Sequence, residues 1–396
     1  MSEPQRPGIY LHVPFCSAVC PYCDFAVTVG GAAARERYVE TLLAEMALVA
    51  DTRDGALAAQ ADTVYFGGGT PTALDPEQLR RVLAGLGERL AVRLGEARIF
   101  LEANPEDVTP TAAAAWRALG VATLSLGVQS FDPAALAFLG RRHDPRRARE
   151  SVATALAAGF DTVSLDLIYG LPGQDAAAWR RDLETAAALA PHHLSCYQLT
   201  VEPGTPFGKR RARGELAELP EAAQAERFRF THRFLADAGY PAYEVSSFAA
   251  TPAHRSRHNR KYWCHAPYLA LGPSAHGFDG GRRRWWNEGR LRPWRRRVEA
   301  GEPPVAGGEV LDDAELALEA LVLGLRTTAG IDLAGFRERH GIDLLATDGA
   351  LVAQLEAAGL ARTEGGPASA RLALTLDGLA VADGIACRFE LGIAPA

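Results

Sequence analysis

The chain has 396 residues, a formal net charge of −6 and an apolar share of 48%. This length exceeds that of a usual single domain, so we expect one large and one small domain with ample apolar residues for a core. No apolar run is long enough to span a bilayer, and the negative charge argues against nucleic acid as the main partner. Residues 1–6 lack the regions of a signal peptide, so we expect a cytoplasmic protein.

Strand-like runs recur through the N-terminal half of the chain, and a stretch of helical composition follows each of them. The runs span residues 9–13, 63–66, 98–102, 122–127, 162–168 and 193–199. This alternation of strand and helix predicts a parallel α/β barrel of six units. Expected helix starts pair a capping side chain with a proline at Thr70-Pro71, Asp75-Pro76, Thr109-Pro110, Asp132-Pro133 and Asp144-Pro145.

The composition changes near residue 302, so we expect a barrel domain in residues 1–300 and a small α+β domain in residues 301–396. Helices are predicted at residues 316–325, 333–340 and 351–358, and short strands at 360–362 and 371–375 around a Gly365-Gly366-Pro367 turn. Three helices and a hairpin resemble a winged-helix domain. Because no basic recognition helix is present, a lid or a partner surface is the expected role.

The first strand-like run leads into a cluster of cysteines. Cys16, Cys20 and Cys23 follow a C-x3-C-x2-C spacing, and the other three cysteines lie far downstream and apart. An odd number of cysteines at this spacing argues against a disulfide framework. Zinc is one alternative, although structural zinc usually takes four ligands, and a chance cluster or a redox pair is another. A [4Fe–4S] cluster held by three thiolates would keep one iron open for a small molecule.

This spacing after a first strand resembles the signature of radical S-adenosylmethionine (SAM) enzymes. The resemblance implies that Cys16, Cys20 and Cys23 hold a [4Fe–4S] cluster, whose open iron is chelated by the amino and carboxylate groups of SAM. It also implies a partial (β/α)6 radical SAM barrel. The flanking residues 10–15, Tyr-Leu-His-Val-Pro-Phe, are similar to the coproporphyrinogen III dehydrogenase family in particular.

Polar residues or glycines follow each of the first five strands, and the loops after barrel strands meet on one face. Glycines allow backbone groups to approach a ligand, buried acids can accept from ribose hydroxyls, and an arginine fork suits a carboxylate. Each residue alone has an ordinary structural explanation, such as a tight turn or a helix cap. Together, the resemblance assigns SAM binding to Tyr10, Tyr22, Gly68, Gly69, Thr70, Glu102, Gln129, Arg141 and Asp166.

Two departures from the dehydrogenases indicate a different branch of the family. Those enzymes have a fourth cysteine two residues after the third, where this chain has Phe25, and a longer segment before the first strand. The pattern is instead similar to the HemW-type haem chaperones. An active oxygen-independent coproporphyrinogen III dehydrogenase, in which a SAM-derived radical attacks propionate side chains, is the first alternative. A zinc-stabilised binding module with a basic surface patch is the second.

A second motif, H-N-x2-Y-W, supports that branch. It comprises His258, Asn259, Tyr262 and Trp263. The resemblance implies that this motif binds haem, with His258 as an axial ligand and the aromatic rings against the macrocycle. The alternative is that His258 is a structural histidine whose ring nitrogens are hydrogen-bonded within the protein. Rival ligands lie nearby in the sequence: His254, Cys264 and His276.

An arginine-rich segment follows the motif. Between Arg282 and Arg297 the chain has eight arginines and three tryptophans, with only Glu288 in opposition. Such a segment suits haem propionates, an anionic membrane surface or single-stranded nucleic acid, and a solvated loop is an equal alternative. The resemblance to the HemW-type haem chaperones implies haem and haem-acceptor proteins of respiration as partners, with membrane-surface association and a homodimer as further expectations.

Overall fold

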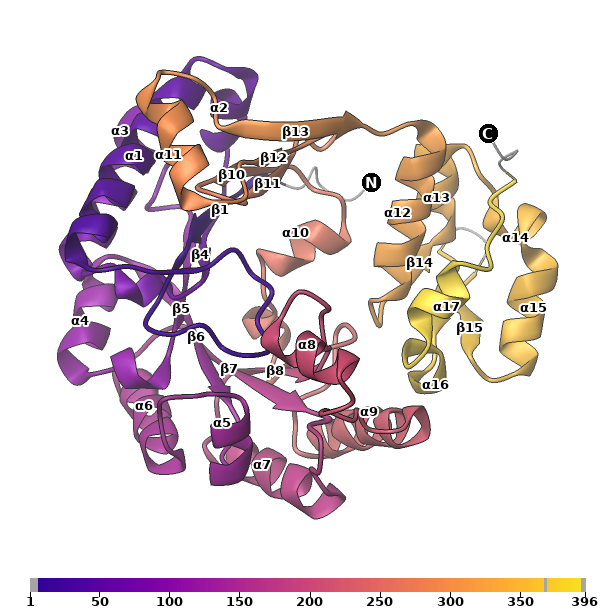
Figure 1. The fold of residues 1–396 in the computed structure, drawn as a ribbon. Helices are drawn as coiled ribbons and strands as arrows, with labels where there is room; N and C mark the ends of the chain where they lie inside the picture. The colour runs from indigo at the N-terminus through magenta and orange to yellow at the C-terminus, as the bar shows by residue number, and fades with distance from the viewer. Residues whose placement is uncertain (1–5, 367–368, 393–396) are drawn as a thin grey trace.

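The computed structural model describes residues 6–366 and 369–392 (Figure 1). Residues 1–5, on which the expected compartment partly rests, and Pro367 of the expected turn lie outside this range. Within the described residues, no helix combines the length and apolar character needed to cross a membrane.

Six consecutive parallel strands form the barrel, which confirms the predicted (β/α)6 arrangement. They are β1 (Gly8–Val13), β4 (Thr63–Gly68), β5 (Arg98–Ala103), β6 (Val121–Gln129), β7 (Thr162–Tyr169) and β8 (His193–Gln198). The helices on the outer side of the curved sheet in Figure 1 are α1 (Ala32–Ala50), α3 (Pro76–Leu90), α4 (Pro110–Ala118), α6 (Pro145–Ala157), α7 (Ala176–Ala188) and α9 (Glu221–Asp237). Shorter helices are α2 (Arg53–Ala58), α5 (Pro133–Phe138) and α8 (Pro206–Ala212).

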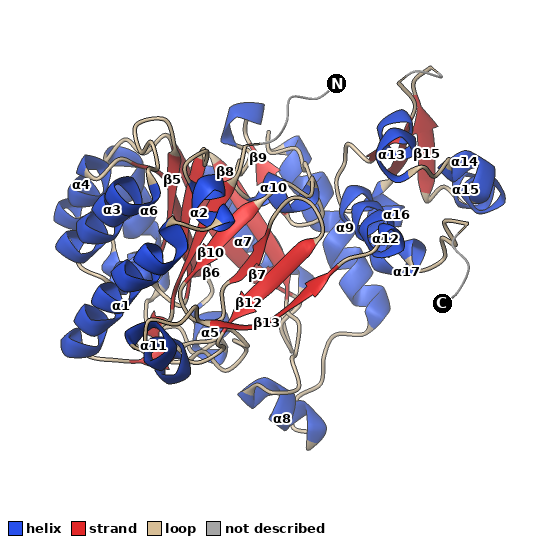
Figure 2. Cartoon of the chain, turned by 90° about the horizontal axis from the view of Figure 1, so that it is seen from above, coloured by secondary structure: helices blue, strands red, loops and turns tan. Residues whose placement is uncertain are grey.

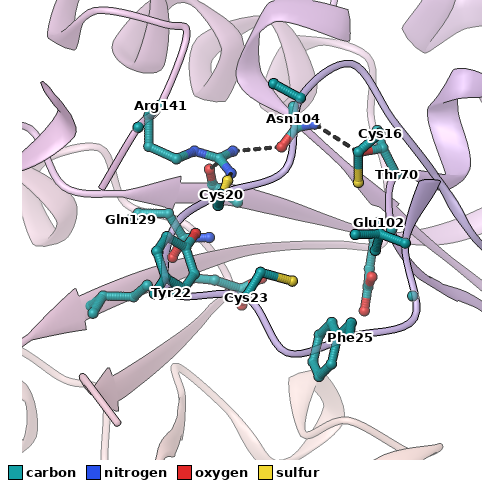
Figure 3. Close-up of a pocket in the computed structure, with 18 of the residues that line it drawn as sticks. Cys16, Cys20, Tyr22, Cys23, Phe25, Thr70, Glu102, Asn104, Gln129 and Arg141 are labelled. Carbon is teal, nitrogen blue, oxygen red and sulfur yellow. Dashed lines mark hydrogen bonds between the residues drawn. The ribbon is translucent and has the colours of Figure 1, made fainter. Parts of the chain in front are cut away.

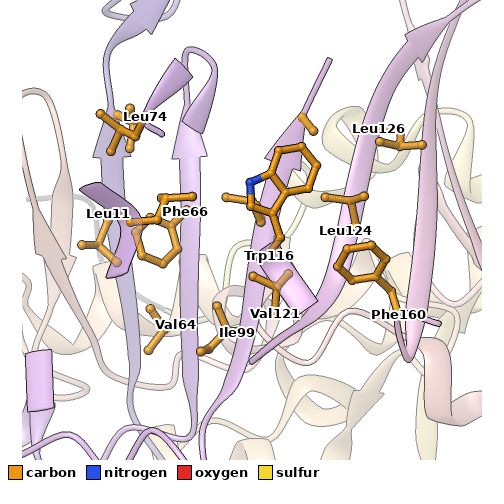
Figure 4. Packing of buried hydrophobic residues seen from close by; sticks show 14 of the residues in the cluster. Leu11, Val64, Phe66, Leu74, Ile99, Trp116, Val121, Leu124, Leu126 and Phe160 are labelled. Atoms are coloured by element: carbon orange, nitrogen blue, oxygen red, sulfur yellow. The ribbon is translucent and has the colours of Figure 1, made fainter. Parts of the chain in front are cut away.

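The two faces of the barrel strands differ in polarity. Side chains such as Leu11, Phe66 and Leu124 are buried in the main core, where they share one cluster with Trp116 of α4 and with Phe160 (Figure 4). Strand alternation turns the intervening residues to the inner face, and these include Tyr65, Glu102, Ser125 and Asp166. Parallel sheets are usually apolar on both faces, so a polar inner face indicates a polar ligand.

The sheet continues beyond β1. Strand β10 (Tyr268–Leu271) pairs parallel with β1, and β11 (His276–Phe278), β12 (Arg283–Asn287) and β13 (Val305–Val310) continue antiparallel. On the other edge, β9 (Ser247–Ala249) pairs antiparallel with β8. Glu45 of α1 fastens the extension, because its carboxylate accepts from Gly272 N at 2.8 Å, Asn287 Nδ2 at 2.7 Å and Trp294 Nε1 at 3.2 Å.

The C-terminal domain has its own core and the expected helices and hairpin. It contains α12 (Asp313–Leu325), α13 (Leu333–His340), α14 (Leu344–Thr347), α15 (Gly349–Ala357), α16 (Leu376–Leu379) and α17 (Ala382–Ala386). Strands β14 (Ile331–Asp332), β16 (Arg371–Leu374) and β15 (Ala361–Glu364) form its antiparallel sheet. Figure 2 shows this domain beside the barrel, after β13. Because β13 pairs with β12, the expected division after residue 300 cuts the large sheet, and we place the boundary after residue 310 instead.

Four of the five expected helix caps are present: Asp75, Thr109, Asp132 and Asp144 each accept from a backbone N–H of the first turn. Thr70 is the exception. A 3-10 turn (Pro71–Ala73) follows it, and its side chain makes no cap hydrogen bond. The expectation of a capped helix there was wrong, because the Thr70 hydroxyl faces the site described next.

Candidate functional site

A cavity of about 480 Å³ opens at the C-terminal ends of the barrel strands (Figure 3). It brings together residues from the cysteine loop and from the ends of β4 to β8, as the barrel rule requires. The predicted residues that line it are Cys16, Cys20, Tyr22, Cys23, Gly68, Gly69, Thr70, Glu102, Gln129, Arg141 and Asp166. Tyr10 does not line the cavity. Its ring lies below, stacked on Tyr65 at 6.1 Å, and its hydroxyl lies 3.2 Å from His12 Nδ1.

The cysteine loop lies between the short strands β2 (Phe15–Cys16) and β3 (Thr28–Val29). Thr70 Oγ1 donates to Cys16 Sγ at 3.6 Å, and Arg141 Nη1 donates to Cys20 Sγ at 3.5 Å. Burial raises the pKa of the Cys23 thiol to about 11 and also raises that of Cys16, so a bound cation is needed to hold these thiolates at neutral pH.

The spacing of the three thiols bears on the choice of metal. In the described ranges, no three His, Cys, Asp or Glu side chains converge on one ion position. A single zinc ion needs such convergence, whereas an iron–sulfur cluster takes each thiolate on a different iron. Three thiolates on three irons would leave the fourth iron of a [4Fe–4S] cluster open.

Arg141 and Asn104 join two sides of the cavity (Figure 3). Arg141 Nη2 donates to Asn104 Oδ1 and to Gly127 O at 2.9 Å, and Asn104 Nδ2 donates to Thr70 Oγ1 at 3.0 Å. Two buried polar atoms of the cavity wall, Arg141 Nε and Gln129 Oε1, have no partner among the described residues. Since buried polar groups are normally paired, these atoms fit a ligand that offers an acceptor and a donor.

The glycine-rich turn after β4 is pressed against the end of β1. A Cβ on Gly69 would lie 2.8 Å from Phe15 O, and Gly68 has φ +109°, which side chains rarely adopt. Gly69 N donates to Val13 O at 2.8 Å. Only glycine therefore allows the turn to pack this closely against the end of β1, where Gly68 and Gly69 also line the cavity.

Two partly buried acids, Glu102 and Asp166, line the cavity. Burial raises the pKa of Glu102 to about 7 and that of Asp166 to about 6. Tyr65 Oη donates to Glu102 Oε1 at 2.7 Å, and Ser125 Oγ donates to Asp166 Oδ2 at 3.2 Å. These acids can accept from ribose hydroxyls, and a nearby sulfonium would favour their ionised forms.

Sequence reasoning did not single out several residues of this site: Tyr65, Asn104, Ser125, Tyr197 and Gln198. Asn104, Tyr197 and Gln198 also lie at or just after the C-terminal end of a strand, so the same positional rule could have found them. Tyr65 and Ser125 lie one step deeper on the inner face, where strand alternation is the signal.

The H-N-x2-Y-W residues are not brought to this cavity. His258 lies at the opposite end of the strands and is only 1% exposed. Its Nδ1 lies 2.9 Å from Thr63 Oγ1 and its Nε2 lies 3.0 Å from Tyr262 Oη, so both ring nitrogens have partners. Asn259 lines a 70 Å³ hollow inside the barrel, and Trp263 lies under the guanidinium of Arg326 at 5.8 Å.

Three of the eight arginines in the arginine-rich segment pair with acids that are distant in sequence. Arg283 pairs with Asp54, Arg282 with Asp313, and Arg284 with both Glu309 and Glu319. Trp285 and Trp294 are buried beneath. The sequence count of one opposing acid was therefore misleading for residues 282–284, whose charges are paired.

Comparison with known proteins agrees with this geometry. Residues 10–186 match the radical SAM superfamily, and residues 311–381 match the HemN C-terminal domain. The fold is similar to that of coproporphyrinogen III oxidase (HemN) from Escherichia coli, a radical SAM enzyme, with a TM-score of 0.82 and 23% identity over 98% of this chain and 91% of that one. The fold and the cysteine loop thus define a radical SAM protein.

Sequence relatives narrow the class. The chain is 38% identical to the heme chaperone HemW of Mycobacterium tuberculosis over 88% of this chain and 89% of that protein. It is 36% identical to the heme chaperone HemW of Escherichia coli K12, over 75% of this chain and 80% of that one. The chain therefore belongs to the HemW family.

Proposed function

We propose that this protein is a haem chaperone that binds haem, a [4Fe–4S] cluster and SAM, and delivers haem to acceptor proteins of respiration. The observation that carries the proposal is the match to relatives named heme chaperone HemW, which extends over most of both chains. Cluster thiolates require a reducing compartment, so we place the protein in the cytoplasm.

The cavity at the strand ends supports the cofactor part of the proposal. Cys16, Cys20 and Cys23 would hold the cluster, and the backbone of the glycine-rich turn would receive the amino group of SAM. Arg141 and Gln129 contribute the unpartnered polar atoms, while Glu102 and Asp166 would meet the ribose or the sulfonium. When bound, the cluster supplies redox chemistry and an open iron.

The alternative is an active coproporphyrinogen III dehydrogenase, which the likeness of fold to HemN favours. That likeness is one of fold alone at 23% identity. Phe25, which stands in place of a fourth cysteine, is 63% exposed at the cavity rim. We therefore rank the dehydrogenase second.

The test is anaerobic reconstitution with iron and sulfide, followed by iron and zinc analysis, SAM titration, haem titration and a coproporphyrinogen assay on the same sample. We expect iron and sulfide in near-equal amounts, stoichiometric haem and no turnover. Turnover without stable haem binding would establish the dehydrogenase, and zinc without sulfide would establish the binding module.

Cysteine variants test which thiolates hold the cluster, and one of them is a matched control. Cys16→Ser, Cys20→Ser and Cys23→Ser should each lose the iron–sulfur absorbance, because a hydroxyl does not replace a thiolate ligand. Cys264→Ser, at an exposed cysteine outside the cavity, should retain it. Equal iron loss in all four variants would contradict the assigned ligands.

A further inference from the structure

A second cleft, of about 390 Å³, lies between the barrel extension and helix α12. One wall is aromatic and consists of Tyr262 of α10 (Asn259–Trp263), Tyr268 of β10 and Phe278 of β11. The opposite wall is the aliphatic side of α12, with Leu318 and Val322. Leu318 is 43% exposed, so α12 presents apolar surface to the opening. Flat apolar walls at this volume suit a planar ligand.

Tyr262 connects this cleft to the H-N-x2-Y-W motif. Its hydroxyl pairs with His258, whereas its ring meets that of Tyr268 edge-on at 4.8 Å and forms part of the cleft wall. The motif therefore shapes the cleft, although His258 itself is buried behind Tyr262 with both ring nitrogens paired.

His265 is the imidazole that lines the cleft. Its Nε2 lies 3.3 Å from Glu319 Oε2, and no hydrogen bond to its Nδ1 is found among the described residues. Its φ of +51° is uncommon for a residue with a side chain, and such strain is often found at functional sites.

A cationic group lies at the same opening. Arg284 Nη1 donates to Glu309 Oε1 at 3.2 Å and its Nη2 pairs with Glu319, so Glu319 contacts both His265 and Arg284. A guanidinium has five donors, and a carboxylate at the cleft mouth could share those that remain. The cleft therefore combines two apolar walls, an imidazole and an arginine.

We propose that this cleft is the haem site, with His265 as the iron ligand and Arg284 as the partner of a propionate. The proposal rests on the proposed haem-chaperone function and assigns its cargo to residues outside the H-N-x2-Y-W motif. Haem held there would contact both the barrel extension and α12, and thus both domains. The role of His258 is then to position Tyr262.

The experiment is a haem titration of the full-length reconstituted protein, in which the absorbance of the Soret band reports haem binding. His265→Ala should lose the histidine-ligated spectrum and weaken binding at least tenfold, and added imidazole should restore the spectrum. Arg284→Met should weaken binding less and leave the band position unchanged. The matched control is His276→Ala, an exposed histidine on β11 that stacks on Trp286 outside the cleft.

A second variant tests the cleft without touching a polar group. Leu318→Trp fills the opening from an exposed position, so it should block haem while leaving the folded protein and its iron–sulfur absorbance intact. If His265→Ala and Leu318→Trp both bind haem with the affinity of the wild type, the cleft is not the haem site, and the proposed chaperone function is unaffected. A wild-type protein that binds no haem would overturn both.

Discussion

The hydroxyl of Tyr65 donates a 2.7 Å hydrogen bond to Glu102 on the floor of the cofactor cavity. The ring of the same tyrosine lies 5.0 Å from that of His258, so one aromatic residue separates the motif from the cavity. The hydrogen bond from Tyr65 favours the ionised form of Glu102. Burial opposes ionisation and raises the pKa of Glu102 to about 7.

Tyr65→Phe should therefore shift the pH dependence of SAM binding. If ionised Glu102 is the form that accepts from SAM, wild-type affinity rises with pH through about 7. Loss of the hydroxyl removes a stabilising hydrogen bond from the carboxylate, so the midpoint moves to higher pH and affinity at pH 7 falls several-fold. Calorimetric titration at several pH values measures this. Tyr10→Phe is the control, because the hydroxyl of Tyr10 contacts His12. If the pH midpoint of SAM binding is the same in the wild type and both variants, ionised Glu102 does not control SAM binding.

Arg141→Lys should weaken SAM binding about tenfold, or about 1.4 kcal/mol. Lysine keeps the charge but cannot contact Asn104, Gly127 and Cys20 together as the guanidinium does. The measurement is SAM titration of the reconstituted protein at fixed pH. Arg146→Lys, at an exposed position of α6, should bind like the wild type, and an unaltered affinity in Arg141→Lys would refute the assignment.

Glu45→Gln should change the pH dependence of stability. Burial raises the pKa of Glu45 to about 7, above its value in the unfolded chain, so its stabilising contribution is complete at low pH. That contribution is lost as pH rises from about 4.5 to about 7, by about 3 kcal/mol. Urea unfolding across this window should show the fall in the wild type and in Glu40→Gln, an exposed position of the same helix, but not in Glu45→Gln. Parallel curves for the three proteins would argue against a protonated Glu45.

Lys261→Met should destabilise the protein by about 3 kcal/mol. Lys261 is only 3% exposed and its Nζ lies 2.6 Å from Asp62 Oδ1, so the substitution removes the buried partner of a buried carboxylate and leaves only an exposed one. Arg257 contacts the same aspartate at 2.7 Å from an exposed position, and Arg257→Met should cost less than about 1 kcal/mol. Urea unfolding of the two variants compares them directly, and similar losses would show that burial of this pair matters little.

Sequence reasoning located the barrel because its signals are local. Alternating strands, proline-marked helix starts and the cysteine spacing are each read within a few residues. Eleven of the twelve residues predicted for the cluster and SAM line one cavity. Tyr10 is the exception: it shares the inner face with Tyr65, on which its ring stacks at 6.1 Å, and it does not line this cavity. Its assignment to SAM binding stays a prediction.

The rest depended on contacts between distant segments. His258 meets Thr63 across the barrel, and Arg283 meets Asp54, so neither the burial of the motif nor the neutralisation of the arginines is visible in the local sequence. His265 has no motif of its own, and its cleft exists only because α12 lies against β10 and β11.

The position of β1 in the sheet has a consequence for the order in which the chain folds. Gly8 pairs with Thr63 on one side and with Tyr268 on the other, so the strand that leads into the cysteine loop acquires its second neighbour late in synthesis. Contacts this distant in sequence form slowly, because a long loop must close first. The ribosome will therefore have made the chain at least as far as residue 268 before the strand that leads into the cysteine loop is held on both edges.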